Sequence, residues 1–96
     1  MLDEAFRDWL ETVDRRPLPQ LRDNIARVRR VERGLDVNLD TEYISDRCGS
    51  VLDRLDVRHA GFDKTVDLPT DTAGLSSLKT AVRKYVKFRD WLQLNK

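Results

Sequence analysis

Cysteine and histidine each occur once in this chain, and glycine and proline together supply only seven of its 96 residues. A single cysteine excludes a framework of internal disulfide bonds. So little glycine and proline among regularly spaced apolar residues argues against a disordered chain. No apolar run approaches the roughly 20 residues that a membrane-spanning helix requires. The first ten residues are acidic where a targeting peptide is basic, so we expect a soluble cytoplasmic protein.

The same scarcity removes most enzymatic chemistry. Cys48 and His59 are the only soft metal ligands, whereas a structural zinc site usually needs four such side chains. A nucleophile activated by histidine is not expected, because nothing near His59 in the sequence orients or tunes it as a base. The glycines are scattered over positions 34, 49, 61 and 74, which excludes a glycine-rich phosphate loop. We therefore expect no catalytic site, no cofactor and no metal, and we interpret Cys48 as a small buried residue.

The apolar residues recur with a period near 3.6, which predicts an all-α fold: one domain, built as a small bundle of four or five helices. Pro19 suits the first turn of the second helix, and Gly34 is a natural stop for it. A long ordered loop is expected at about residues 57–73, since this segment exceeds most structureless connections. The four main helices are expected over residues 3–13, 19–34, 40–55 and 75–92.

The third of these helices contains a glycine, Gly49, at which it could be interrupted. Asp40 is expected to cap its N-terminus. Gly49 lowers helix stability by about 1 kcal/mol relative to alanine, so the segment forms either one helix or two. Its inward-facing residues are predicted to be Ile44, Cys48, Val51 and Leu55.

The last helix combines a broad apolar face with a row of positive charges. Lys79, Arg83 and Lys87 recur four residues apart, and no acidic residue of this helix precedes Asp90. Trp91 falls outside the apolar arc, so it either covers the end of the chain or belongs to a contact surface. The apolar face comprises Leu75, Leu78, Ala81, Val82, Tyr85, Val86, Phe88 and Leu92.

One pentapeptide occurs twice. FRDWL at residues 6–10 returns letter for letter at residues 88–92, and in both copies Phe and Leu lie four positions apart on one helical face. The flanking residues do not align, so the chain is not a repeat protein. We interpret the two copies as helices that reached the same packing solution independently.

The net charge of +1 conceals a strong segregation of charge along the chain. Residues 1–14 carry a net −4, residues 15–33 a net +5, residues 34–74 a net −5 and residues 75–96 a net +5. Two interpretations remain open. Neighbouring elements of opposite sign attract each other within the fold, or the two basic helices lie side by side and form one positive face.

A positive face would suit DNA, because proteins hold the phosphate backbone with lysine and arginine side chains, commonly from helices. An exposed tryptophan beside such a face can stack on a base or sugar. The isoelectric point of about 7.9 is below that of a typical basic binding domain. The candidate DNA-contacting residues are Arg22, Arg29 and Arg33 on the second helix, and Lys79, Arg83, Lys87 and Trp91 on the fourth.

Three segments together resemble a small helical module found ahead of nuclease or other effector domains in bacterial restriction and phage-defence proteins. TAVRKYVKF at residues 80–88 is similar to its S-A-L-R-K-Y-x-x-F ending, and FRDWL at residues 6–10 to its F-x-x-W-L opening. NIARVRRVERGLDVNLD at residues 24–40 is similar to its middle helix and the following Gly-Leu-Asp turn, although the aromatic expected after Ile25 is missing. More distantly, the pattern resembles the DNA-clasping core-binding domain of tyrosine recombinases.

The resemblance implies an all-α bundle that assists DNA recognition or docks a partner, and it carries over no catalytic residue. We therefore expect a non-catalytic module that contacts DNA through its second and fourth helices in a restriction, defence or recombination context. The alternative is a protein-interaction module, such as a phage-encoded inhibitor or an accessory subunit of a defence complex. A regulatory fragment of a larger nuclease is a third interpretation.

Overall fold

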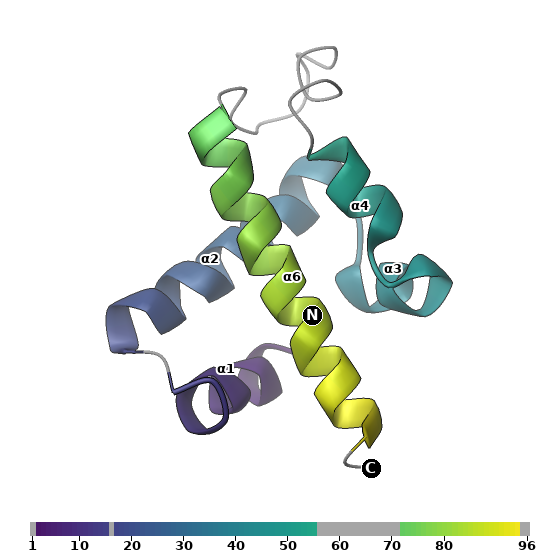
Figure 1. Cartoon of the computed structure of the whole chain (residues 1–96). Helices are drawn as coiled ribbons and strands as arrows, with labels where there is room; N and C mark the ends of the chain where they lie inside the picture. Colours follow the sequence, from purple (N-terminus) through teal and green to yellow (C-terminus); the bar gives the residue numbers. More distant parts are fainter. Residues whose placement is uncertain (1, 16, 56–71, 95–96) are drawn as a thin grey trace.

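The computed structural model describes residues 2–15, 17–55 and 72–94, and this part of the chain is all-α (Figure 1). It contains no β-strand, and no described helix is both long and apolar enough to cross a membrane. Residues 57–71 of the predicted ordered loop, with His59, lie outside the described residues; residues 72 and 73 belong to the last helix. The described helices are α1 (Asp3–Thr12), α2 (Leu18–Leu35), α3 (Leu39–Asp46), α4 (Gly49–Arg54) and α6 (Thr72–Leu94).

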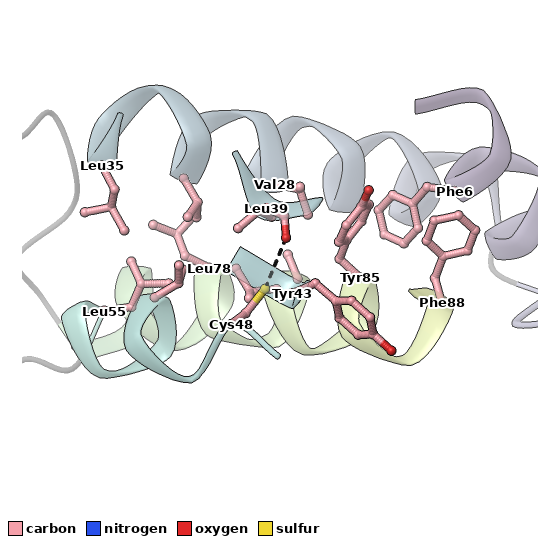
Figure 2. Packing of buried hydrophobic residues seen from close by; sticks show 14 of the residues in the cluster. Phe6, Val28, Leu35, Leu39, Tyr43, Cys48, Leu55, Leu78, Tyr85 and Phe88 are labelled. Atoms are coloured by element: carbon pink, nitrogen blue, oxygen red, sulfur yellow. Dashed lines mark hydrogen bonds between the residues drawn. The ribbon is translucent and has the colours of Figure 1, made fainter. Parts of the chain in front are cut away.

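The long helix α6 organises the fold. It lies across α2, and α1 packs against both helices at one end, while α3 and α4 form a short pair on the other side of α6 (Figure 1). The buried side chains of all five helices meet in one cluster, in which Phe6, Val28, Leu39, Leu55 and Tyr85 are inaccessible to solvent (Figure 2). Because this cluster uses the predicted apolar face of α6, the predicted orientation of that helix is confirmed.

The second helix ends differently from the prediction. Gly34 lies inside α2, and the helix stops at Leu35 because the next residue, Asp36, adopts a left-handed conformation with φ 54°. A short polar side chain such as aspartate tolerates this conformation better than most residues. The residue that ends the helix is therefore Asp36, two positions after the predicted stop at Gly34.

The third predicted helix is two helices. Arg47 and Cys48, with φ of 54° and 65°, interrupt the segment before Gly49, which begins α4. Asp40 is not the cap of α3: the side chain of Asn38 accepts hydrogen bonds from the amides of Asp40 (2.9 Å) and Thr41 (3.3 Å). The cap is Asn38, so the predicted cap was two residues late and the predicted start of the helix one residue late.

Ile44 was predicted to face inward and does not; its side chain is 77% exposed. Over its eight residues, α3 buries Leu39 and Tyr43, which lie four positions apart on one face. Ile44 follows Tyr43 by one position, about 100° further around the helix. The other three predicted inward residues, Cys48, Val51 and Leu55, are buried.

The two copies of FRDWL meet in the core. The rings of Phe6 and Phe88 are both inaccessible to solvent, with centroids 5.4 Å apart (Figure 2). The ring of Trp9 is tilted against that of Phe88 at 6.0 Å, and the rings of Tyr85 and Phe6 form an edge-to-face pair at 5.0 Å. Offset and edge-to-face pairs of this kind add stability beyond the burial of area. The repeated pentapeptide therefore supplies both sides of one contact, between α1 and α6.

Cys48 is predicted to be unreactive in the native protein. Its thiol is inaccessible and lies 3.6 Å from the carbonyl oxygen of Leu39 (Figure 2). Burial raises its pKa to about 12, and thiolate is the reactive form. We expect alkylation by iodoacetamide to be at least about a hundredfold slower in buffer than in denaturant, because reaction requires opening of a stable core. Equal rates in the two conditions would show that Cys48 is not in the core.

Candidate nucleic-acid interface

The basic row predicted on the last helix lies on the outer side of α6. Arg83 and Lys87 are exposed and Lys79 is half-buried, whereas Leu78 and Val82, each about 100° around the helix from the following cation, are buried in the core. Successive members of the row are four residues apart, about 6 Å along the helix axis. The three cations therefore extend over about 12 Å on one side of the molecule. We call Lys79, Arg83 and Lys87 the α6 basic row.

The described residues around the α6 basic row do not compensate its charge. Within the described ranges, none of its three side chains makes an ion pair. The nearby acid of the same helix, Asp90, is already engaged: it accepts hydrogen bonds from the hydroxyl of Tyr43, at 2.5 Å, and from Arg47. The positive potential of the row is therefore directed to solvent.

Polar and aromatic groups continue the row in both directions. The side chains of Ser76 and Thr80 are exposed on the same side of α6. Trp91 lies one turn beyond Lys87 with 36% of its surface exposed, as its position outside the apolar arc predicted. Leu94, at 86% exposure, lies about one turn further. The outer side of α6 thus presents cations with two hydroxyl groups near the first of them, then an aromatic and an aliphatic group.

The three candidate arginines of α2 lie on a different surface. Arg22, Arg29 and Arg33 are exposed, and Arg22 and Arg29 border a groove of about 330 Å³ between α1 and α2. A second hollow of about 390 Å³ shares Ala26 and Arg29 with the first, is lined by residues of α2 and is bordered by Arg33. We call both hollows together the α1–α2 groove. Arg7 also lines it and was missed from the sequence, since it lies in a segment of net negative charge.

The two sets of basic residues are not brought together. Helices α2 and α6 are neighbours, but they pack through their buried sides, and each basic set lies on the exposed side of its own helix. The structure therefore has two basic surfaces, one along α6 and one along the α1–α2 groove. Seven candidates that formed one group in the sequence are divided between them.

Some of the basic residues of α2 and α6 form ion pairs with the acidic N-terminal segment. Lys84 on α6 contacts Asp14, which follows α1, at 2.7 Å, and both side chains are largely buried. Arg29 pairs with Asp3 across α1 and α2. These pairs join basic helices to the acidic N-terminal segment, as the first interpretation of the charge pattern expected. They use Arg29 among the seven candidates and leave the α6 basic row untouched.

A polar network fixes α3 against α6. The carboxylate of Asp40 accepts hydrogen bonds from the hydroxyl of Tyr85 and from Arg89, the latter at 3.1 Å. The guanidinium of Arg89 lies 5.1 Å from the centre of the Tyr43 ring, a favourable cation–π geometry. Burial and the hydrogen bond to Asp40 raise the pKa of Tyr85 well above its usual value, so this hydroxyl stays a donor. The network joins residues more than forty positions apart, and no sequence pattern indicates it.

The same network determines the charge beside the α6 basic row. Burial raises the pKa of Asp90, but the hydrogen bonds from Tyr43 and Arg47 outweigh this effect and hold the pKa below its usual value. Asp90 is therefore ionised at neutral pH and shared between two partners of its own chain. Its negative charge is balanced by Arg47 and does not neutralise Lys87.

No metal centre is found among the described residues, which contain no group of three or more histidine, cysteine, aspartate or glutamate side chains able to hold an ion. The arrangement supports binding of an anion along α6 or in the α1–α2 groove. The resemblance to modules of restriction and defence proteins remains a prediction. No protein-family model, curated protein or solved structure matches the chain.

Proposed function

We propose that this protein is a cytoplasmic, non-catalytic helical module that contacts the phosphate backbone of DNA through the outer side of α6. The observation that carries the proposal is the α6 basic row: three cations at one-turn spacing, without an ion pair among the described residues. Lysine and arginine contacts to phosphates supply most of the sequence-independent affinity of proteins for DNA.

The neighbouring groups fit the same role. Serine hydroxyls commonly donate hydrogen bonds to phosphate oxygens, and the exposed Ser76 lies beside the row. The hydroxyl of Thr80 is already used, since it donates to the carbonyl oxygen of Ser76 at 2.9 Å. Trp91, one turn beyond Lys87, is placed to stack on a base or sugar where the backbone is followed past the cations. The result is a surface that positions DNA without reading its sequence, as in a module that assists another recognition element.

The α2 arginines are less suited to contact DNA than the α6 basic row, although the hypothesis of one positive face included them. Arg29 is held by Asp3, and the carboxylates of Glu4 and Glu32 border the same groove, so an approaching phosphate meets both signs of charge. We therefore assign the primary DNA contact to α6. The restriction, phage-defence or recombination context rests on the sequence resemblance and belongs to this proposal.

The test is fluorescence anisotropy of labelled duplex and single-stranded DNA, titrated with the protein at about 50 and about 200 mM salt. We expect micromolar binding at the lower concentration that weakens steeply at the higher one, with a log–log slope near −2.7 if three phosphates are neutralised. Arg83→Glu should weaken binding by about tenfold for unrelated sequences alike and reduce the slope by about one.

The matched control is Arg54→Glu, which reverses an exposed arginine on another helix, α4, that borders neither hollow. It should change the affinity little, because it alters net charge equally but not the proposed contact. Absence of wild-type binding at low salt, or equal losses in the two variants, would contradict the proposal.

A protein-interaction module is the second candidate, and exposed apolar side chains favour it. Ile44 is 77% exposed and Leu94 is 86% exposed, and interface cores commonly use such groups together with aromatics. In this case Trp91→Ala should weaken partner binding more than substitution of any single lysine of the α6 basic row, since buried aromatics dominate interface energies. A phage-encoded inhibitor or an accessory subunit of a defence complex fits this candidate.

A further inference from the structure

The α1–α2 groove has an apolar floor that the α6 surface lacks. Ile25 is half-buried and packs against the core, Leu21 is only 2% exposed, and Ala26 is exposed. All three line the same groove of about 330 Å³. This volume is at the lower end of the range for small-ligand pockets and is sufficient for one or two side chains of a peptide.

The rim of the groove is positive once internal contacts are considered. Asp3 is paired with Arg29, and the carboxylate of Glu32 accepts a hydrogen bond from the amide of Leu39 at 2.9 Å, at the start of α3. Among the described residues, Arg7, Arg22 and Arg33 make no ion pair. Three guanidinium groups therefore remain for a ligand, beside the carboxylates of Glu4 and Glu32, which keep their negative charge.

We propose that the α1–α2 groove binds an acidic peptide segment of a partner protein, with an apolar side chain of the peptide on the Ile25–Ala26 floor. Guanidinium groups pair with carboxylates through two parallel hydrogen bonds, so Arg7, Arg22 and Arg33 are suited to aspartate and glutamate on either side of that anchor. The proposal concerns a different surface from the DNA contact of α6 and does not depend on it.

The chemistry favours a peptide over nucleic acid at this surface. A phosphate backbone presents no apolar side chain for the floor, and its continuous negative charge would be repelled by Glu4. In a peptide, acidic residues can lie opposite the arginines while an apolar residue contacts the floor of the groove. The small size of the groove indicates a weak, transient contact.

The experiment selects peptides from a random library displayed on phage against the immobilised 96-residue chain. We expect enriched sequences to combine several acidic residues with a neighbouring aliphatic or aromatic one. A synthetic copy of the strongest binder should lose about tenfold or more in affinity to the Arg22→Glu/Arg33→Glu variant, by charge repulsion at the rim. The matched control, Arg83→Glu/Lys87→Glu, should stay within about twofold, since it changes net charge equally on the other surface.

A second variant separates docking in the groove from general attraction to positive charge. Ala26→Arg adds a cation and fills the floor at the same time. Docking in the groove predicts weaker binding in this variant, whereas attraction to charge alone predicts tighter binding. Circular dichroism is used to check that each variant folds, which we expect because all substituted positions are exposed.

Several results would overturn the proposal. Selection that enriches no acidic sequences, tighter binding by Ala26→Arg, or equal losses in the two double variants would each do so. Loss of duplex DNA binding in Arg22→Glu/Arg33→Glu as large as in Arg83→Glu/Lys87→Glu would show instead that the α2 arginines belong to a nucleic-acid surface. Failure of wild-type DNA binding would leave the peptide result unaffected, so the two proposals fail separately.

Discussion

Leu78→Asp is expected to unfold the protein. Leu78 is 2% exposed and lies on the core side of α6, among the side chains that join this helix to the rest of the cluster (Figure 2). An unpaired carboxylate at this position costs several kcal/mol, against a total stability of about 5–15 kcal/mol for a typical domain and near the lower end for a small one. The variant should lose most helical circular dichroism at 222 nm and show no cooperative urea transition.

The matched control is Ile44→Asp, the same kind of change at a residue that the sequence also placed inside. Because Ile44 is 77% exposed, this variant should remain folded with a stability change of less than about 0.5 kcal/mol. A soluble, fully helical Leu78→Asp protein would mean that α6 is turned the wrong way. Unfolding of the Ile44→Asp variant would mean that Ile44 faces the core and that the orientation of α3 is wrong.

The contrast between these two residues shows where sequence periodicity is sufficient. In α6 the apolar pattern runs over five turns, so many residues agree on which face is buried, and that face was predicted correctly. In α3 the pattern covers only two turns, and an inward residue at Tyr43 or at Ile44 satisfies it about equally well. The break at Arg47 and Cys48 decides between them, and both residues adopt left-handed conformations that their side chains do not favour.

Contacts between distant residues were beyond prediction for another reason. Asp40 was a plausible helix cap by type, but its carboxylate is used by Tyr85 and Arg89 of α6. Many acidic and basic residues of this chain are able to pair by type alone, and the choice depends on how the helices cross. The segregation of charge predicted that pairs would form, not which ones.

The same limit applies to the candidate site. The spacing of Lys79, Arg83 and Lys87 correctly placed three cations on one side of a helix, since i and i+4 neighbours share a face whatever the fold. Whether Arg22 and Arg33 join them depends on which side of α2 packs on α6, and this is a property of the whole core. Arg7 was missed because the candidates were chosen from segments of net positive charge. A groove, in contrast, is lined by single side chains from several segments, and Arg7 comes from one of net negative charge.

Phe88→Ala is expected to destabilise the protein by about 3–5 kcal/mol, the range for large aromatic residues removed from a core. Its ring is inaccessible and lies 5.4 Å from Phe6 and from Tyr85 and 6.0 Å from Trp9. Two of these three neighbours belong to α1, so the cavity opens at the contact that holds α1 onto α6. The measurement is urea unfolding followed by circular dichroism, with Leu94→Ala as the control.

Leu94 lies on the same helix but is 86% exposed, so its truncation should change stability by less than about 0.5 kcal/mol. A double-mutant cycle with Phe6→Ala tests the cause, since residues in contact show non-additive effects. If the two copies of FRDWL stabilise the fold through one shared contact, the second truncation costs clearly less in the presence of the first. Additive losses would mean that each phenylalanine is stabilised by other neighbours, and that the repeated pentapeptide is a coincidence of composition and not the two halves of one interface.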